Sequence, residues 1–192
     1  MAIELVDISK AYGSTIVLDK FSCTIETGEA TCIMGASGQG KTTLLRIMLD
    51  LEQADSGRIT GLQHQRKSVV FQEDRLCENL SAASNIKLVC QKPLKMGKIM
   101  EAMAAMDLDP DCAVQTVYRM SGGQRRRVAV LRALAADYDI LLMDEPFKGL
   151  DTKTKDRVMR YTKEQSRGKT VVIVTHDRSE CEAMGGRIIH IN

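Results

Sequence analysis

Residues 35–42, GASGQGKT, have the residue types and the spacing of a loop that binds the phosphate groups of a nucleotide. They fit the pattern G-x-x-x-x-G-K-[ST], directly after a predicted strand and directly before a predicted helix. In such a loop glycines let backbone amides curve around the β-phosphate, the lysine brings charge to the β- and γ-phosphates, and the threonine hydroxyl is offered to Mg²⁺. The residues expected to bind the nucleotide here are Gly35, Ala36, Ser37, Gly38, Gln39, Gly40, Lys41, Thr42 and Thr43.

An acidic pair that could serve the same nucleotide follows the apolar run at residues 140–143. Four apolar residues predict a buried strand, and Asp144 and Glu145 emerge at its carboxyl end. Nucleotide sites of open parallel sheets lie at that end of the strands. We therefore expect Asp144 to hold Mg²⁺ through its water shell, and Glu145 to orient or deprotonate the attacking water.

The elements that must position these residues indicate an α/β fold. Strands are predicted at 31–34, 67–71, 140–143, 170–175 and 187–191, with strand-like alternation between residues 3 and 25, and helices are predicted at 41–51, 122–136 and 151–167. Buried strands that alternate with helices imply parallel β/α units. A further helical stretch, residues 80–108, lies between the two halves of this pattern and is expected to form a subdomain inserted into the core.

A stripe of methionines marks that helical stretch. Met96, Ile99, Met100, Met103 and Met106 recur at spacings of three and four residues. One interpretation is a helix face packed on its own domain. The other is an adaptable surface for a partner, because methionine side chains repack easily.

The composition is that of an ordinary globular protein, with 44% hydrophobic residues, 27% charged residues and a net charge of +2. Such a charge balance lacks the basic field of a nucleic-acid binder, and no aromatic residues are interleaved with the arginines at 125–127, so no nucleic-acid partner is expected. No uncharged apolar stretch approaches the ~18 residues of a membrane span, and the amino terminus lacks a signal-peptide core. The six cysteines include no C-x-x-C pair. They are expected to be reduced, largely buried thiols of a cytosolic domain.

The segment MSGGQ at residues 120–124, followed by RRRVAVLRAL, completes a set of motifs that resembles the nucleotide-binding cassette of ATP-binding cassette (ABC) transporters. The motifs occur in the order of the family and cover essentially the whole chain. The resemblance implies one nucleotide-binding domain over residues 1–192, with a P-loop NTPase core in 1–72 and 137–192. That core would contain a mixed, mainly parallel sheet and an N-terminal antiparallel β part. The inserted helical subdomain would be about 73–136, including the signature helix.

The resemblance also implies a role for single residues, with ATP and Mg²⁺ as the cofactors. Beyond the loop and the acidic pair, the matched positions are Tyr12 (stacking on adenine), Gln72 (Q-loop), Ser121, Gly122, Gly123 and Gln124 (signature), Asp151 (D-loop) and His176 (switch histidine). The residues implied in catalysis are Glu145, His176, Gln72 and Lys41, and those implied at the metal are Thr42, Gln72 and Asp144.

The signature has a chemistry of its own. Ser121 is expected at the N-cap of a helix, where its hydroxyl and the amides of Gly122 and Gly123 form an anion-binding end. A side chain at either glycine would block the close approach of an anion to the backbone. In the family this end meets the γ-phosphate bound by the other protomer, which implies a head-to-tail dimer.

The partners implied by the resemblance are integral membrane permease subunits, a second nucleotide-binding subunit that forms a homodimer with this one, and a solute-binding protein of the same system. The chain would then be cytoplasmic and peripheral on the inner face of the cell membrane. The segment FQEDRLCENLSAASNI is similar to that of nitrate/sulfonate/taurine-type importers. Lys148 stands in the D-loop where the family usually has serine, and the chain ends soon after the switch histidine, so we expect no C-terminal regulatory domain.

Two other functions are open to a chain with these motifs. One is a non-transport cassette that transmits ATP-driven motion to a cell-envelope partner. The other, a stand-alone P-loop kinase, is disfavoured because a kinase has no use for SGGQ. For the transporter, Gln72, Leu76, Cys77 and Leu80 are expected to border an exposed apolar groove that receives a helix of the membrane subunit. The alternative is that these apolar residues pack inside the subdomain.

Overall fold

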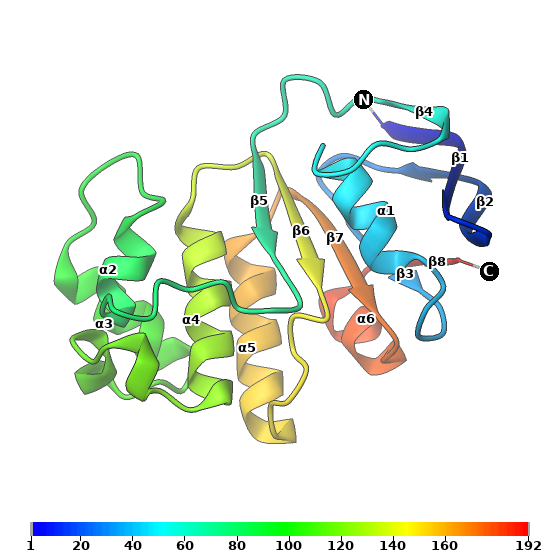
Figure 1. Cartoon of the computed structure of the whole chain (residues 1–192). Helices are drawn as coiled ribbons and strands as arrows, with labels where there is room; N and C mark the ends of the chain where they lie inside the picture. Colours follow the sequence, from blue (N-terminus) through cyan, green and yellow to red (C-terminus); the bar gives the residue numbers. More distant parts are fainter. Residues whose placement is uncertain (1, 192) are drawn as a thin grey trace.

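The structure is a computed structural model that describes residues 2–191. Its strands form two sheets, one of three strands in the order β2-β1-β4 and one of five in the order β5-β6-β7-β3-β8 (Figure 1). The strands are β1 (Ile3–Tyr12), β2 (Thr15–Ile25), β3 (Ala30–Met34), β4 (Ser56–Thr60), β5 (Lys67–Val70), β6 (Ile140–Asp144), β7 (Thr170–Thr175) and β8 (Arg187–His190). The helices are α1 (Lys41–Met48), α2 (Ala82–Lys87), α3 (Met96–Ala105), α4 (Gly122–Ala135), α5 (Thr152–Gln165) and α6 (Arg178–Met184), with short 3-10 helices η1 (Pro110–Ala113) and η2 (Val117–Arg119).

The α/β architecture expected from the sequence is present, and its parallel and antiparallel parts are separate. Every neighbouring pair in the five-stranded sheet is parallel. The antiparallel pairs, β1 with β2 and β1 with β4, belong to the three-stranded sheet. The sheet predicted as mixed is therefore parallel among the described strands, and the antiparallel part forms a layer of its own.

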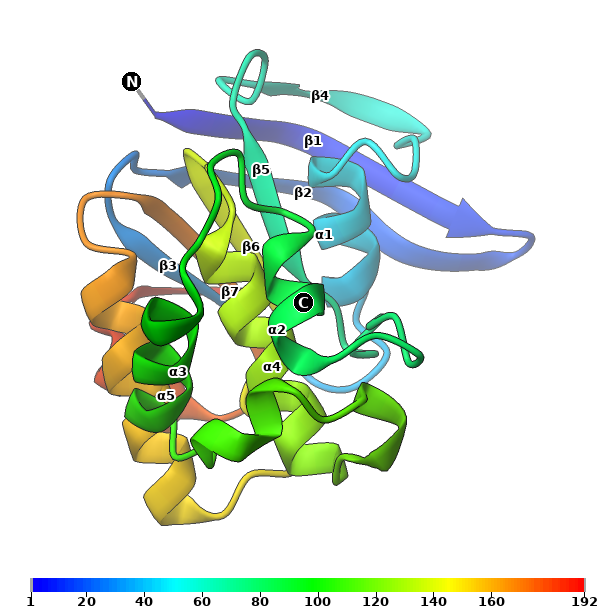
Figure 2. The same cartoon turned by 90° about the vertical axis from the view of Figure 1, so that its left-hand side faces the viewer.

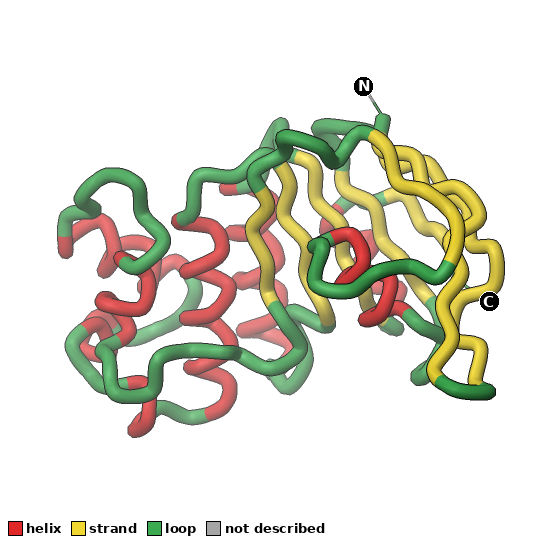
Figure 3. The backbone as a smooth tube through the Cα atoms, turned by 45° about the horizontal axis from the view of Figure 1, so that its top comes forward, coloured by secondary structure: helices red, strands yellow, loops and turns green. Residues whose placement is uncertain are grey.

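Side-chain alternation along β6 divides the core into two clusters. Ile140 and Leu142 contribute to a cluster with α1 and the three-stranded sheet, whereas Leu141 and Met143 contribute to a cluster with α4 and α5. Successive side chains of a strand point to opposite sides of a sheet, so the two clusters together bury both faces of β6. Figure 3 shows the strands gathered on one side of the molecule and most of the helices on the other.

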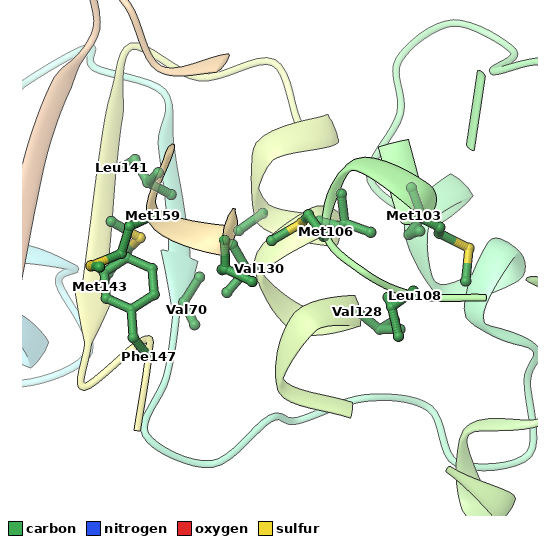
Figure 4. Packing of buried hydrophobic residues seen from close by; sticks show 14 of the residues in the cluster. Val70, Met103, Met106, Leu108, Val128, Val130, Leu141, Met143, Phe147 and Met159 are labelled. Carbon is green, nitrogen blue, oxygen red and sulfur yellow. The ribbon is translucent and has the colours of Figure 1, made fainter. Parts of the chain in front are cut away.

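The helical part shares its core with the parallel sheet. In Figure 4 the labelled side chains run from Leu141 and Met143 through Val130 of α4 to Met106 and Met103. Figure 2 shows α2 and α3 on the outside of this layer, beside α4. The helical region therefore packs directly onto the parallel sheet through α4.

The methionine stripe is mostly internal. Ile99, Met103 and Met106 are buried in the cluster that contains α4 and α5, Met100 packs against that cluster, and Met96 is exposed. The first interpretation, a helix face packed on its own domain, is confirmed for these inner positions. Among the helices of residues 2–191, none is long and apolar enough to cross a membrane.

The stretch 80–108, predicted as helical throughout, is divided into two helices. α2 ends at Lys87 and α3 begins at Met96, and the connecting segment contains Pro93. Proline lacks a backbone N–H and disfavours the helical conformation in the residue before it. The prediction of a continuous helical pattern was therefore wrong between these helices.

Two elements, β4 and α6, lack a periodic pattern of apolar residues that would predict them from the sequence. β4 is exposed except for partly buried Ile59, so it shows no apolar alternation, and it is held by its antiparallel pairing with β1. α6 has seven residues, which is too short for a helical pattern. Both were missed because backbone pairing and packing, rather than their own side-chain pattern, stabilise them.

All six cysteines are free thiols. Cys32, Cys112 and Cys181 are buried, as expected, and burial raises the pKa of Cys32 and Cys181. Cys77 is exposed, contrary to the general expectation of buried thiols.

Candidate functional site

The loop between β3 and α1 requires glycine at two positions. A Cβ atom on Gly35 would lie 2.6 Å from the Cγ2 atom of Ile191, and one on Gly40 would lie 2.5 Å from the carbonyl oxygen of Val17. Gly40 also has a φ of 79°, a conformation that L side chains rarely adopt. The two glycines of the predicted phosphate-binding pattern are thus needed by the fold of the loop itself.

Lys41 is the cation enclosed by this loop. Its side chain donates hydrogen bonds to the carbonyl oxygens of Gly35 at 2.9 Å and Ala36 at 2.7 Å, and the residue is only 8% exposed. The Gln39 side chain closes the loop by accepting the backbone N–H of Ala36. Lys41 therefore has carbonyl partners that an incoming phosphate can replace with a stronger, charged acceptor.

Thr42 and Asp144 meet at the carboxyl end of β6. The Thr42 hydroxyl donates a 2.7 Å hydrogen bond to Oδ2 of Asp144. Burial raises the pKa of Asp144, and the hydrogen bond from Thr42 acts in the opposite direction. A divalent cation would favour the ionised carboxylate further.

Glu145 and His176 form the second pair of the site. Nδ1 of His176 lies 2.8 Å from Oε1 of Glu145. The backbone of Glu145 has a φ of 47°, and its N–H donates to the carbonyl oxygen of Val174 over 2.8 Å. A positive φ is costly for a residue with a side chain, so the adjacent strand β7 holds Glu145 in a conformation that it would not adopt alone.

These side chains surround a cavity of about 310 Å³. Its lining residues are Tyr12, Val17, Ser37, Gly38, Gly40, Lys41, Thr42, Thr43, Gln72, Asp144, Glu145, Lys148 and His176. The structure thus brings together the predicted loop, the Q-loop glutamine, the acidic pair, the switch histidine and the aromatic residue. Two lining residues, Val17 and Lys148, were not predicted as site residues; Lys148 was noticed only as a departure from the family, and Val17 carried no signal.

The residues at this cavity fit a magnesium ion bound together with a nucleotide. Thr42, Gln72 and Asp144 supply a hydroxyl, an amide and one carboxylate on the same wall. Within residues 2–191 no group of three His, Cys, Asp or Glu side chains could hold a metal by itself. Magnesium is commonly held by one or two carboxylates with waters and substrate phosphates, which is the set that this wall and a nucleotide provide.

Tyr12 lies at the end of β1, on the edge of the cavity. The residue is about half exposed, its hydroxyl donates a hydrogen bond to Glu52, and the ammonium of Lys10 lies 5.6 Å from the ring centroid. The hydrogen bond to Glu52 is the main cause that raises the pKa of Tyr12. An aromatic face held at the rim in this way can stack on a planar base.

The predicted signature lies apart from the cavity. Ser121 caps α4 by accepting the N–H of Gln124 at 3.3 Å, and the side chain of Gln124 accepts the N–H of Ser121 at 2.9 Å. A Cβ on Gly122 would meet no atom within 4 Å. Nothing within the described chain therefore requires glycine at that position, and the open backbone is free for a group from outside.

Asp151 also lies outside the cavity lining. Its carboxylate caps α5 by accepting the N–H of Thr154 at 3.1 Å, and this bond is the main cause that lowers the pKa of Asp151. The structure gives Asp151 a capping role at the start of α5, outside the cavity.

The hollow beside Gln72 is polar, in contrast to the apolar groove expected there. It has a volume of about 310 Å³ and is lined by Thr42, Arg46, Phe71, Gln72, Glu73, Arg75 and Asp144. Leu76 packs against the cluster that contains α4 and α5, whereas Cys77 and Leu80 are exposed. The predicted set is thus divided between the interior and the surface.

Comparison with known proteins places these features in one family. A family model described as ABC transporter matches residues 18–148. The chain is 35% identical to the spermidine/putrescine import ATP-binding protein PotA of Treponema pallidum, over all of this chain and 54% of the relative. It is also 35% identical to the sulfate/thiosulfate import ATP-binding protein CysA of Methylococcus capsulatus, over all of this chain and 61% of the relative. The chain therefore spans between half and two thirds of the length of these two relatives.

Other relatives match over most of their length. The probable sulfate/thiosulfate import ATP-binding protein CysA of Chlorella vulgaris is 36% identical over 98% of this chain and 86% of its own. Among solved structures, the dimeric ABC transporter cassette MJ0796 has a TM-score of 0.85 and 31% identity, covering 98% of this chain and 94% of that one. The same cassette in a post-hydrolysis state bound to ADP and Pi matches with a TM-score of 0.85 and 30% identity, over 99% of this chain and 94% of that one.

Proposed function

This chain belongs to the ABC transporter family, and we propose from that membership that it is the ATP-binding and ATP-hydrolysing subunit of an ABC transporter. The observation that carries the proposal is the meeting of six residues from four separate segments at one cavity: Lys41, Thr42, Gln72, Asp144, Glu145 and His176. They supply a phosphate-binding cation, a set of metal ligands, a base and a histidine that contacts the base.

Hydrolysis follows from the roles of these side chains. Lys41 binds the β- and γ-phosphates, and the Glu145 carboxylate orients a water and accepts its proton as the water oxygen bonds to the γ-phosphorus. The bond from the γ-phosphorus to the bridging oxygen breaks, and ADP leaves with the electron pair. When bound at Thr42, Gln72 and Asp144, Mg²⁺ neutralises charge on the phosphate oxygens. His176 holds the Glu145 carboxylate through the 2.8 Å contact and can donate to the γ-phosphate.

The active form proposed is a head-to-tail dimer. Within one chain the signature residues Ser121 and Gly122 do not line the cavity, and their open helix end is suited to an anion. In a dimer of this kind the signature of one chain completes the cavity of the other. The MJ0796 cassette, which is similar to this chain, is dimeric, and this supports the proposal of a dimer.

The partners proposed are integral membrane permease subunits, with the chain peripheral on the cytoplasmic face of the cell membrane and with a solute-binding protein in the same system. This rests on the relatives named as import ATP-binding proteins. The division into a core, residues 1–72 and 137–192, and a helical subdomain, about 73–136, is part of the same proposal. Residues 1 and 192 of that division lie outside the part that the structure describes.

The test has two arms. The purified chain is incubated with ATP and Mg²⁺, and phosphate release is measured with and without EDTA; we expect hydrolysis that EDTA abolishes and added Mg²⁺ restores. The chain is then tagged and purified from detergent-solubilised membranes of its own cells, and we expect an integral membrane protein to accompany it. Absence of Mg²⁺-dependent hydrolysis at high protein concentration would refute the ATPase, and recovery without a membrane subunit would refute the transporter role alone.

A further inference from the structure

An ion-pair cluster joins α5 to the segment that follows β7. Nζ of Lys155, in α5, lies 2.6 Å from Oδ2 of Asp177 and 2.5 Å from Oε1 of Glu180. Glu180 is only 3% exposed, so its charge needs a cation inside the protein. Lys155 supplies that cation and thereby attaches the start of α6 to α5.

The same carboxylates fix the backbone on both sides of His176. The buried hydroxyl of Thr175 donates to Oε2 of Glu180 over 2.6 Å and accepts the N–H of Asp177 at 3.1 Å. The Asp177 carboxylate accepts the N–H of Ser179 at 2.9 Å and so caps α6. Its hydrogen bond with Lys155 is the main cause that lowers the pKa of Asp177 to about 2, so this carboxylate is ionised at neutral pH. Lys155 therefore holds Asp177 directly and holds Thr175 through Glu180, so both neighbours of His176 are fixed.

The side chain of His176 has little else to hold it. The imidazole is 64% exposed, and its hydrogen bond within the described chain is the one with Glu145. An exposed ring with one such contact gains little from packing, so its position depends on the backbone that carries it. That backbone is the segment anchored by Lys155.

We propose, resting on the proposed ATP hydrolysis, that Lys155 is a positioning residue that holds the His176 segment against α5 so that the imidazole reaches Glu145 and the γ-phosphate. Lys155 does not line the nucleotide cavity and acts only through His176. Its N–H bonds the carbonyl oxygen of Asp151 at 2.8 Å in the first turn of α5. The first turn of α5 thus connects Asp151, the D-loop aspartate, to Lys155, which holds the segment of His176.

The variants separate positioning from folding. Lys155→Met alone would leave the buried Glu180 without a cation and could unfold the chain. The double variant Lys155→Gln/Glu180→Gln replaces the buried Lys155–Glu180 pair with two neutral amides and leaves only the more exposed Asp177 without its cation. Lys155→Arg keeps the positive charge. The matched control is Lys153→Gln on the same helix, because Lys153 is exposed and its side chain has no hydrogen bond or ion pair within residues 2–191. Circular dichroism and thermal unfolding first establish that each variant is folded.

Two readouts are compared. In the double variant we expect kcat for ATP to fall roughly tenfold to a hundredfold, as small misplacements of catalytic groups do, while KM stays within about twofold. Lys155→Arg should recover most of kcat, and Lys153→Gln should equal the wild type. A folded double variant with a kcat within about twofold of the wild type would overturn the proposal.

The second readout does not depend on hydrolysis. The chain has three histidines, so the imidazole NMR signal of His176 can be assigned with a His176→Ala variant. At fixed pH the His176 signal should move in the double variant, whereas the signals of His64 and His190 should not. If the wild type lacks ATPase activity, the proposed function fails but this shift still tests the role of Lys155. An unmoved His176 signal in the double variant refutes that role whatever the activity.

Discussion

The hydroxyl of Thr42 donates a 2.7 Å hydrogen bond to the carboxylate of Asp144, across a sequence separation of 102 residues. Thr42 lies in the first turn of α1, and Asp144 is the last residue of β6. The bond therefore joins the phosphate-binding loop to the acidic end of the sheet, and it holds two of the three expected metal ligands within reach of one ion. The site is thus preorganised by contacts of the protein alone, which lowers the cost of ordering it when a nucleotide binds.

Lys41→Ala should abolish ATP hydrolysis and markedly weaken ATP binding. Lys41 is the enclosed cation of the loop, and loss of a charged hydrogen bond to phosphate costs about 1.5–3 kcal/mol, or roughly tenfold to more than a hundredfold in affinity. Binding is measured by isothermal titration with MgATP, and hydrolysis by phosphate release. Turnover equal to that of the wild type would mean that the cavity around Lys41 is not the site.

Glu145→Gln should bind MgATP but lose most of its turnover. The amide keeps the size of the carboxylate but cannot accept the proton of the attacking water. ATP-bound dimer should then accumulate, which light scattering at high protein concentration detects. A variant that hydrolyses ATP normally, or that stays monomeric with MgATP, would contradict the assignment of Glu145.

A mixing experiment tests the head-to-tail dimer. Gly122→Val should fold normally, since a Cβ there meets nothing within 4 Å, but it should block the signature end. Lys41→Ala and Gly122→Val are each expected to be inactive. A random mixture should regain about a quarter of wild-type turnover, because half of the dimers are mixed and each mixed dimer has one intact site of two. A mixture as inactive as its components would argue against sites shared between chains.

Lys148→Ser should weaken nucleotide binding in a salt-dependent manner. Lys148 lines the cavity, and its side chain has no hydrogen bond or ion pair within residues 2–191. A unit charge near the phosphates is worth on the order of 1 kcal/mol in a solvated site, so the Kd for MgATP should rise about fivefold at low salt. The difference should shrink at about 1 M salt, where the Debye length falls to ~3 Å. Lys148→Arg is the control, and equal affinities for all three proteins would show that Lys148 does not contribute.

Gly40→Ala should destabilise the protein more than Gly38→Ala. Both glycines have positive φ, so alanine at either position costs about 1 kcal/mol or more in backbone strain. At Gly40 the new Cβ would also lie 2.5 Å from the carbonyl oxygen of Val17, whereas at Gly38 it would meet nothing within 4 Å. Urea unfolding without nucleotide measures the difference, and equal free energies of unfolding would mean that the loop relaxes away from the clash.

Much of the site could be read from the sequence because its parts are contiguous. The loop at 35–42, the acidic pair and the signature each depend on neighbouring residues whose backbone amides and side chains act together. The parallel strands were equally readable, since strands buried on both faces are continuous apolar runs. These features depend on residues that are close in the chain, so they can be recognised from a single sequence.

The remaining features depend on contacts between distant segments. β4 is defined by its pairing with β1, and the polar hollow at Gln72 is formed by residues of three segments. The sequence by itself determined the motifs from which ATP binding and hydrolysis are proposed. Only the tertiary structure decided that Lys148 faces the cavity, that the signature stands apart from it, and that Lys155 bonds Asp177 and Glu180. Such contacts form when backbone hydrogen bonds and burial bring distant segments together, so the spacing of residues along the chain does not predict them.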